Sequence, residues 1–197
     1  MTTPVDDPAH EPPQPSAWVM RFAALLAPGA SVLDLACGSG RHVRVLAARG
    51  HTVHAVDRDE QALEPLRGIA NVLVTDLEAD AWPFAAQTFG GVIVTNYLWR
   101  PLLPHVVSAV ASSGVLIYET FALGNETVGK PRNPEFLLRP GELLDAVRPA
   151  LRVVAYEDGF VRAPKPAYVQ RICAVREGTL AQLSATSAES PPAKYNL

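Results

Sequence analysis

A glycine-containing turn between two regular segments is the feature that most constrains how this chain folds. Residues 31–36 form a short apolar run, Gly38-Ser39-Gly40 follow it, and a helix is predicted over residues 41–49. Glycines let the backbone turn tightly and let a ligand approach without meeting a Cβ atom. The N-terminus of the helix presents free N–H groups at the same place. The pattern therefore predicts a buried strand, a ligand-binding turn and a helix.

Strand-like and helix-like segments alternate along most of the chain. The predicted helices cover residues 17–26 (capped by Ser16), 41–49, 60–67 (capped by Asp59), 104–111 and 140–147. The predicted strands cover residues 31–36, 52–56, 71–74, 91–95, 114–118, 152–157 and 169–176. Regular alternation favours a mainly parallel sheet with helices on both faces.

The end of the chain breaks this alternation. Residues 158–167 hold Gly159, Pro164 and Pro166, and they leave no room for a helix between the last two strands. Consecutive strands without a crossover helix pair antiparallel. The predicted fold class is α/β: a doubly wound, seven-stranded, mostly parallel sheet with one antiparallel strand in a C-terminal hairpin.

The length of 197 residues fits one domain. We expect a disordered, proline-rich N-terminus over residues 1–16, a folded domain over residues 17–177 and a flexible tail over residues 178–197, because the two ends offer little that can be buried. The start lacks the basic and apolar regions of a secretory signal. Cys37 and Cys173 lie in apolar surroundings, which predicts buried free thiols and suits the reducing cytoplasm.

Charge and composition exclude some classes of partner. The net charge is only −3 and no polybasic run is present, which argues against nucleic acid as a partner and gives no sign of membrane-surface binding. No apolar stretch approaches the roughly 18 residues that a membrane span needs. The cysteines do not have metal-ligand spacing, so no metal is predicted.

Two carboxylates follow the second and third predicted strands. Asp57 lies about 20 residues past the glycine turn, where nucleotide-binding folds place an acidic acceptor for the ribose hydroxyls. Asp76 ends the third strand, where its carboxylate can accept the adenine amino group while Leu77 packs against the ring. Together with the turn, these residues predict a site for a nucleotide-like cofactor.

The turn itself narrows the choice of cofactor. The dinucleotide fingerprint needs a third glycine where this chain has Val43, and no Walker-type Gly-Lys-Ser/Thr is present. Asp34 precedes the turn, where its carboxylate can hold the loop backbone or orient water near a cationic ligand. A sulfonium cofactor suits that negative charge, whereas a pyrophosphate does not.

The segment from Val32 to Gly40 resembles motif I of class I S-adenosylmethionine-dependent methyltransferases, and Ala55-Val56-Asp57 and Thr75-Asp76-Leu77 resemble their second and third motifs. The chain departs from the family pattern at Ala36, where many members have a glycine. The composition of residues 119–138 also resembles an uncharacterised bacterial group distantly similar to the tellurite-resistance methyltransferases.

The resemblance implies a role for each matching residue. Asp34, Ala36, Gly38 and Gly40 would line the methionine end of S-adenosylmethionine, Asp57 would bind the ribose, and Asp76 and Leu77 would flank the adenine. The implied cofactor-binding set also includes Arg58 beside Asp57, His42 (and Arg41) near the carboxylate, and Asn96 and Tyr97 next to the methyl group.

Two segments are the candidates for binding the methyl acceptor. Residues 95–101 lack the Asp/Asn-Pro-Pro-aromatic motif of enzymes that methylate base amino groups, and residues 119–138 have the length and composition of a binding loop. The expected substrate-binding residues are Trp99, Arg100, Lys130, Arg132 and Phe136, with Lys130 and Arg132 receiving an anionic acceptor. The expected catalytic residues are Tyr97 and Glu119, with His105 as a further candidate base.

The sequence therefore predicts a cytoplasmic enzyme, monomeric or homodimeric, that methylates a small molecule with S-adenosylmethionine. Two alternatives stay open. One is an RNA or protein methyltransferase, and the other is a non-catalytic module that binds S-adenosylmethionine for a partner interaction.

Overall fold

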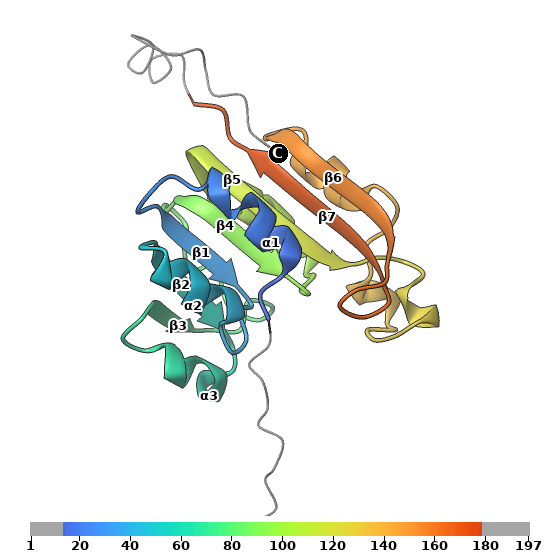
Figure 1. Ribbon diagram of the computed structural model, residues 1–197, viewed down its shortest axis with the longest axis horizontal. Helices are drawn as coiled ribbons and strands as arrows, with labels where there is room; N and C mark the ends of the chain where they lie inside the picture. The colour runs from blue at the N-terminus through green and yellow to red at the C-terminus, as the bar shows by residue number, and fades with distance from the viewer. Residues whose placement is uncertain (1–13, 179–197) are drawn as a thin grey trace, which may run out of the picture.

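The computed structural model describes residues 14–178 and contains one seven-stranded sheet. The strands are β1 (Ser31–Leu35), β2 (Thr52–Asp57), β3 (Asn71–Val74), β4 (Phe89–Thr95), β5 (Val110–Phe121), β6 (Arg152–Val161) and β7 (Ala167–Val175). Their order is β3-β2-β1-β4-β5-β7-β6 (Figure 1). The neighbours from β3 to β5 pair parallel, and β7 pairs antiparallel with both β5 and β6. The predicted fold class is confirmed, including the single reversed strand.

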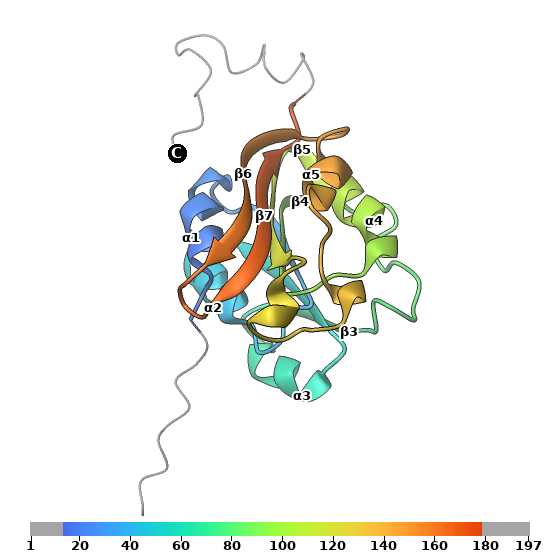
Figure 2. The same ribbon diagram turned by 90° about the vertical axis from the view of Figure 1, so that its right-hand side faces the viewer.

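Five α-helices cover the two faces of the sheet: α1 (Ala17–Phe22), α2 (Arg41–Ala48), α3 (Glu60–Leu63), α4 (Leu103–Ser108) and α5 (Glu142–Val147). Short 3-10 helices are η1 (Ala23–Leu25), η2 (Glu64–Leu66), η3 (Arg100–Leu102), η4 (Asn125–Thr127) and η5 (Pro134–Phe136). Figure 2 shows the sheet between α1 and α2 on one side and α4 and α5 on the other.

The central strands β1 and β4 are buried on both faces because their apolar side chains alternate between two cores. In β1, Val32 packs with α1 and α2, whereas Leu33 and Leu35 pack with α4 and α5. In β4, Ile93 belongs to the first core and Val92 to the second. The apolar runs that predicted these strands thus pack against a layer of helices on each face of the sheet.

Helix starts agree with the sequence better than helix ends. The Ser16 hydroxyl accepts from the backbone N–H groups of Trp18 and Val19, and the Asp59 carboxylate accepts from that of Ala62, so both predicted N-caps are confirmed. The predicted helix 17–26 ends at Phe22 and continues as a 3-10 turn. The predicted helix 60–67 does the same after Leu63.

The boundaries of β5 and the hairpin were predicted incorrectly. β5 begins at Val110 instead of residue 114, because Phe89 pairs with Val110 through an irregular register that includes Ser113 at φ +61°. The predicted helix 104–111 accordingly ends at Ser108. In the hairpin, β6 extends to Val161 and β7 starts at Ala167, because backbone pairing at an exposed sheet edge does not require apolar side chains.

Further expectations concern the thiols and the two ends of the chain. Cys37 and Cys173 are buried free thiols, as expected. The expected N-terminal segment and C-terminal tail lie almost entirely outside the described residues. Within residues 14–178, no helix is long and apolar enough to cross a membrane, and no group of His, Cys, Asp or Glu is arranged to hold a metal ion.

Candidate functional site

The glycine turn has a backbone that ordinary residues rarely adopt. Ala36, Gly38 and Gly40 have φ values of 51°, 54° and 76°, all in the left-handed region. Gly40 is also the N-cap of α2, and a Cβ atom built there would lie 2.5 Å from the side chain of the buried Leu66. Ala36 adopts the glycine-like conformation despite its methyl group. The turn is therefore fixed by close packing as well as by its glycines.

Asp57 fastens this turn to the end of β2. Its Oδ2 atom accepts from the Gly38 N–H group at 2.8 Å, and its Oδ1 atom accepts from the Asp59 N–H group at 3.0 Å. The sequence suggested that Asp34 could hold the loop backbone. In the structure Asp57 does so instead, because its carboxylate reaches the turn from the neighbouring strand.

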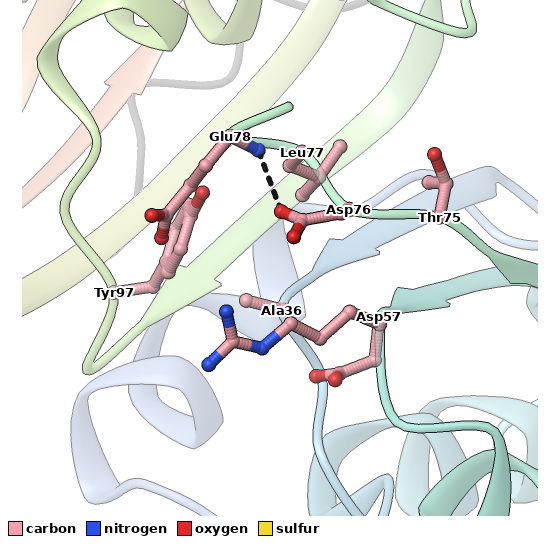
Figure 3. A pocket seen from close by; sticks show the side chains of 8 residues that line it. Ala36, Asp57, Thr75, Asp76, Leu77, Glu78 and Tyr97 are labelled. Carbon is pink, nitrogen blue, oxygen red and sulfur yellow. Dashed lines mark hydrogen bonds between the residues drawn. The ribbon is translucent and has the colours of Figure 1, made fainter. Parts of the chain in front are cut away.

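A pocket opens beside the turn, at the carboxyl ends of β1 to β4 (Figure 3). The residues that line it are Ala36, Asp57, Arg58, Thr75, Asp76, Leu77, Glu78 and Tyr97. Figure 3 shows Asp76 above and Asp57 below in the pocket, and the Asp76 carboxylate accepts from the Glu78 N–H group at 3.0 Å. Five predicted cofactor-binding residues besides Tyr97 meet here: Ala36, Asp57, Arg58, Asp76 and Leu77.

Asp34 and His42 form a buried pair between β1 and α2. The Asp34 carboxylate is fully buried, and neither of its oxygen atoms has a hydrogen-bond partner. Burial raises the pKa of Asp34 to about 7, although Arg41 opposes this shift. The nearest His42 atom, Nδ1, lies 3.9 Å from Asp34 Oδ2.

The protonation of His42 follows from its other contact. Its Nε2 atom accepts from the Ser16 N–H group at 3.0 Å, so Nδ1 carries the proton and faces Asp34. Burial lowers the pKa of His42 to about 3, which keeps the ring neutral. Neither residue lines the pocket. They lie behind the turn and link it to the segment that precedes α1.

A second pocket adjoins the first at the carboxyl ends of β4 and β5. Its lining residues are Glu78, Asn96, Tyr97, Leu98, Thr120, Phe121, Pro131 and Phe136. Glu78 and Tyr97 line both pockets, and Figure 3 shows them together at one end of the first. A ligand in one pocket would therefore lie next to a ligand in the other.

Tyr97 stands between the two pockets with an unsatisfied hydroxyl group. The hydroxyl is buried and has no hydrogen-bond partner, which costs about 1–3 kcal/mol until a ligand supplies one. Burial raises the pKa of Tyr97, with further contributions from Glu78 and Asp76. The phenol therefore stays protonated, and the structure favours a donor role over the role of a base.

Glu119, the other expected catalytic residue, lines neither pocket. It lies on β5 between Tyr118 and Thr120, whose side chains point to the opposite face of the sheet. Its carboxylate is 3.9 Å from the Arg171 guanidinium, and the Glu119 side chain is only 16% exposed. The structure thus places Glu119 in an ion pair and not beside the pockets.

Only one of the expected substrate-binding side chains lines the second pocket, and that is Phe136. Trp99 packs against the core. The Arg132 side chain donates to the Gly129 carbonyl oxygen, and Lys130 is exposed. The structure does not bring these basic side chains together as a site for an anion.

Arg100 is held by other protein groups. Its guanidinium binds both carboxylate oxygens of Glu142, at 2.7 and 3.0 Å. It also donates to the carbonyl oxygens of Glu135 and Leu137, at 2.6 and 2.9 Å. Arg100 therefore fixes the loop on either side of Phe136.

The sequence did not single out Glu78, Leu98, Thr120, Phe121 and Pro131 among the lining residues. The sequence contained a signal for three of these five residues. Glu78 directly follows the Asp76-Leu77 motif, and Thr120 and Phe121 end a strand at the edge where ligands bind in such sheets. Pro131 offered no such signal, because the direction of a long loop is set by tertiary contacts.

Comparison with known proteins shows which family the sequence is similar to. Residues 32–113, less than half of the chain, match a family described as Methyltransferase domain. No curated protein matches the chain.

Solved structures share the fold at low sequence identity. A TehB-like SAM-dependent methyltransferase from Corynebacterium glutamicum has a TM-score of 0.60 and 19% identity, over 81% of this chain and 87% of that one. TehB from Haemophilus influenzae has a TM-score of 0.65 and 18% identity, over 81% and 61%. A coclaurine N-methyltransferase bound to N-methylheliamine and SAH has a TM-score of 0.55 and 17% identity, over 72% and 50%.

The family match and the fold point to the same class of protein. Residues 32–113 are similar to the methyltransferase domain family, and the fold is shared with solved S-adenosylmethionine-dependent methyltransferases. The cofactor of this class is S-adenosylmethionine, as the sequence motifs predicted.

Proposed function

We propose that this chain transfers a methyl group from S-adenosylmethionine, bound in the first pocket, to a small molecule bound in the second. The observation that carries the proposal is the contiguity of the two pockets, which share Glu78 and Tyr97. S-adenosylmethionine supplies an electrophilic methyl group on a sulfonium. Methyl transfer needs alignment and exclusion of water more than it needs acid–base groups.

The residues around the first pocket suit this cofactor. Each carboxylate oxygen of Asp57 accepts one backbone N–H group and can accept a second hydrogen bond from a ribose hydroxyl. Asp76 and Leu77 offer an acceptor and an apolar surface for adenine. The unpartnered carboxylate of Asp34 behind the turn suits the positive charge of the methionine end. Gly38 and Gly40 would leave the turn backbone accessible to that end, with Asn96 at the methyl group.

The second pocket supports a small acceptor over RNA or a protein chain. Pro131 and Phe136, from the loop after β5, cover the carboxyl ends of the strands, and the loop is held down by Arg100. A pocket lined mainly by apolar and aromatic side chains suits a compact ligand. The coclaurine N-methyltransferase, which shares the fold, is described with a small molecule bound. Two buried free thiols are compatible with action in the cytoplasm.

Calorimetry with S-adenosylmethionine and S-adenosylhomocysteine tests the cofactor part of the proposal. We expect one molecule bound per chain and at least a tenfold loss of affinity in Asp57→Ala, which also loses the acceptor of the Gly38 N–H group. Asp145→Asn is the matched control, because Asp145 is an exposed partner of Arg148 on α5. Absence of binding to the wild-type protein would overturn the proposal.

A turnover screen tests the acceptor part. Purified protein is incubated with S-adenosylmethionine and fractionated metabolites, and formation of S-adenosylhomocysteine is followed. We expect activity in a low-molecular-weight fraction. Activity confined to RNA or protein fractions would contradict a small-molecule acceptor while leaving the cofactor assignment intact.

A further inference from the structure

The walls of the second pocket are mostly flat and apolar. Three aromatic side chains line it, Tyr97, Phe121 and Phe136, together with Leu98 and Pro131. Such surfaces favour a ligand with a planar, apolar body, because stacking and apolar contact strengthen when rings meet rings. The pocket therefore selects for the shape of a flat molecule.

The second pocket has few polar lining groups, and the charge that they carry is negative. Glu78 is the one charged side chain among the lining residues, and Asn96, Thr120 and the Tyr97 hydroxyl are neutral. Asp76 lines the adjoining pocket next to Glu78. A carboxylate ligand would meet repulsion here, whereas an ammonium group would be attracted by Glu78 and by the aromatic faces.

The basic residues near the pocket do not reverse this balance. Arg100 is neutralised by the bidentate contact with Glu142 and is further occupied by two carbonyl oxygens. Lys130 and Arg132 belong to the covering loop, but their side chains are not part of the lining. The expectation of an anionic acceptor, which rested on those two residues, has no counterpart in this geometry.

Contacts on both sides of Phe136 fix the position of this side chain at the second pocket. Phe136 is 42% exposed and would be mobile on a free loop, yet Arg100 binds the carbonyl oxygens of the residues on both sides of it. Glu142 in turn anchors Arg100 to the start of α5. Phe136 thus presents a fixed face to the pocket.

We propose that the second pocket binds a flat, apolar molecule that carries an amine, and that this amine nitrogen is the methyl acceptor. This inference rests on the proposed function, since it assigns the acceptor of the same site. The nitrogen lone pair forms the new C–N bond as the methyl–sulfur bond breaks, and the sulfur keeps that electron pair and leaves as a neutral thioether. The ammonium form must first lose its proton, and the exposed Glu78 carboxylate passes it to water.

Calorimetric titration with two matched probes tests the inference without requiring turnover. Tryptamine and indole-3-acetate share an indole ring and differ in carrying an amine or a carboxylate. Each is titrated into protein saturated with S-adenosylhomocysteine at about pH 7.5. We expect tryptamine to bind at least about tenfold more tightly than indole-3-acetate, through the sum of the carboxylate and aromatic contributions.

Two variants separate charge from shape. Glu78→Gln should reduce the preference for tryptamine about threefold to fivefold, because it removes the charge and leaves the walls. Phe136→Ala should weaken both probes. Glu177→Gln, which removes an exposed carboxylate paired with Arg152, serves as the matched control and should change neither affinity.

The outcomes distinguish this inference from the proposed function. If S-adenosylhomocysteine binds but indole-3-acetate binds as tightly as tryptamine, the amine assignment is overturned and the methyltransferase assignment stands. Failure of tryptamine to bind to the S-adenosylhomocysteine complex overturns it as well. Failure of S-adenosylhomocysteine to bind removes the proposed function and this inference with it.

Discussion

The buried carboxylate of Asp34 makes the stability of this protein depend on pH in an unusual direction. Burial raises the pKa of Asp34 from its ordinary value of 3.8 to about 7 in the folded state. The folded state therefore binds a proton that the unfolded state releases near pH 4. Stability from this group is present below pH 4 and is lost as the pH rises through about 7.

The magnitude follows from the size of the shift. A change of about 3 pKa units at 1.36 kcal/mol per unit gives about 4 kcal/mol. In Asp34→Asn the titrating group is absent. We therefore expect the free energy of unfolding of the wild-type protein, relative to Asp34→Asn, to fall by about 4 kcal/mol between about pH 4 and pH 8.

Urea unfolding at several pH values measures this difference directly. Comparing the two proteins at each pH removes the contributions of all other titrating groups, and comparing two pH values removes any fixed effect of the asparagine. A constant difference between the two proteins across this range would refute the conclusion that Asp34 is buried without a partner. A difference that grew with pH in favour of the wild-type protein would show that Asp34 is stabilised as a carboxylate.

Three further changes test other parts of the structure. Gly40→Ala should destabilise the protein by about 1–3 kcal/mol more than Gly50→Ala in urea unfolding, because both glycines have positive φ but only Gly40 packs against Leu66; equal losses would contradict close packing at the turn. Gln170→Leu should lower the free energy of unfolding by about 2–4 kcal/mol, because the buried Gln170 amide accepts from the Leu143 N–H group and donates to the Arg139 carbonyl oxygen. The same change at the exposed Gln87 should alter it by less than about 0.5 kcal/mol. Similar effects of the two changes would contradict the buried contact. Arg100→Gln should raise the Kd of tryptamine at least about fivefold and leave that of S-adenosylhomocysteine unchanged, as calorimetry would show, because the carbonyl oxygens beside Phe136 lose their donor; an unchanged tryptamine Kd would contradict the positioning role.

The order and pairing of the strands were predictable because each depends on local patterns. Apolar runs separated by helical segments predicted the parallel sheet, and the prolines at 164 and 166 predicted the hairpin. The start of β5 was not predictable in this way. Ser112-Ser113-Gly114 has the composition of a turn, yet the chain continues in the sheet through a bulge opposite Phe89 and Gly91. Such a register is set by the neighbouring strand.

The cofactor side of the site was more predictable than the acceptor side. Asp57 and Asp76 follow strands, and parallel strands bring their carboxyl ends to one edge. Arg100, Lys130 and Arg132 were expected at the acceptor because basic side chains in loops often bind ligands. The structure uses Arg100 to bind Glu142, 42 residues further along the chain, and no local pattern indicates that contact. Side-chain direction in a long loop depends on tertiary partners.

A crystal structure of the complex with S-adenosylhomocysteine is the most direct test of the central claim that the two adjoining pockets hold cofactor and acceptor. The proposed function predicts the adenosine in the first pocket, with the ribose hydroxyls on Asp57 and the adenine between Asp76 and Leu77. It also predicts that the sulfur atom faces the second pocket beside Tyr97. The ligand bound elsewhere, or with its sulfur directed away from Tyr97 and Phe136, would contradict the claim.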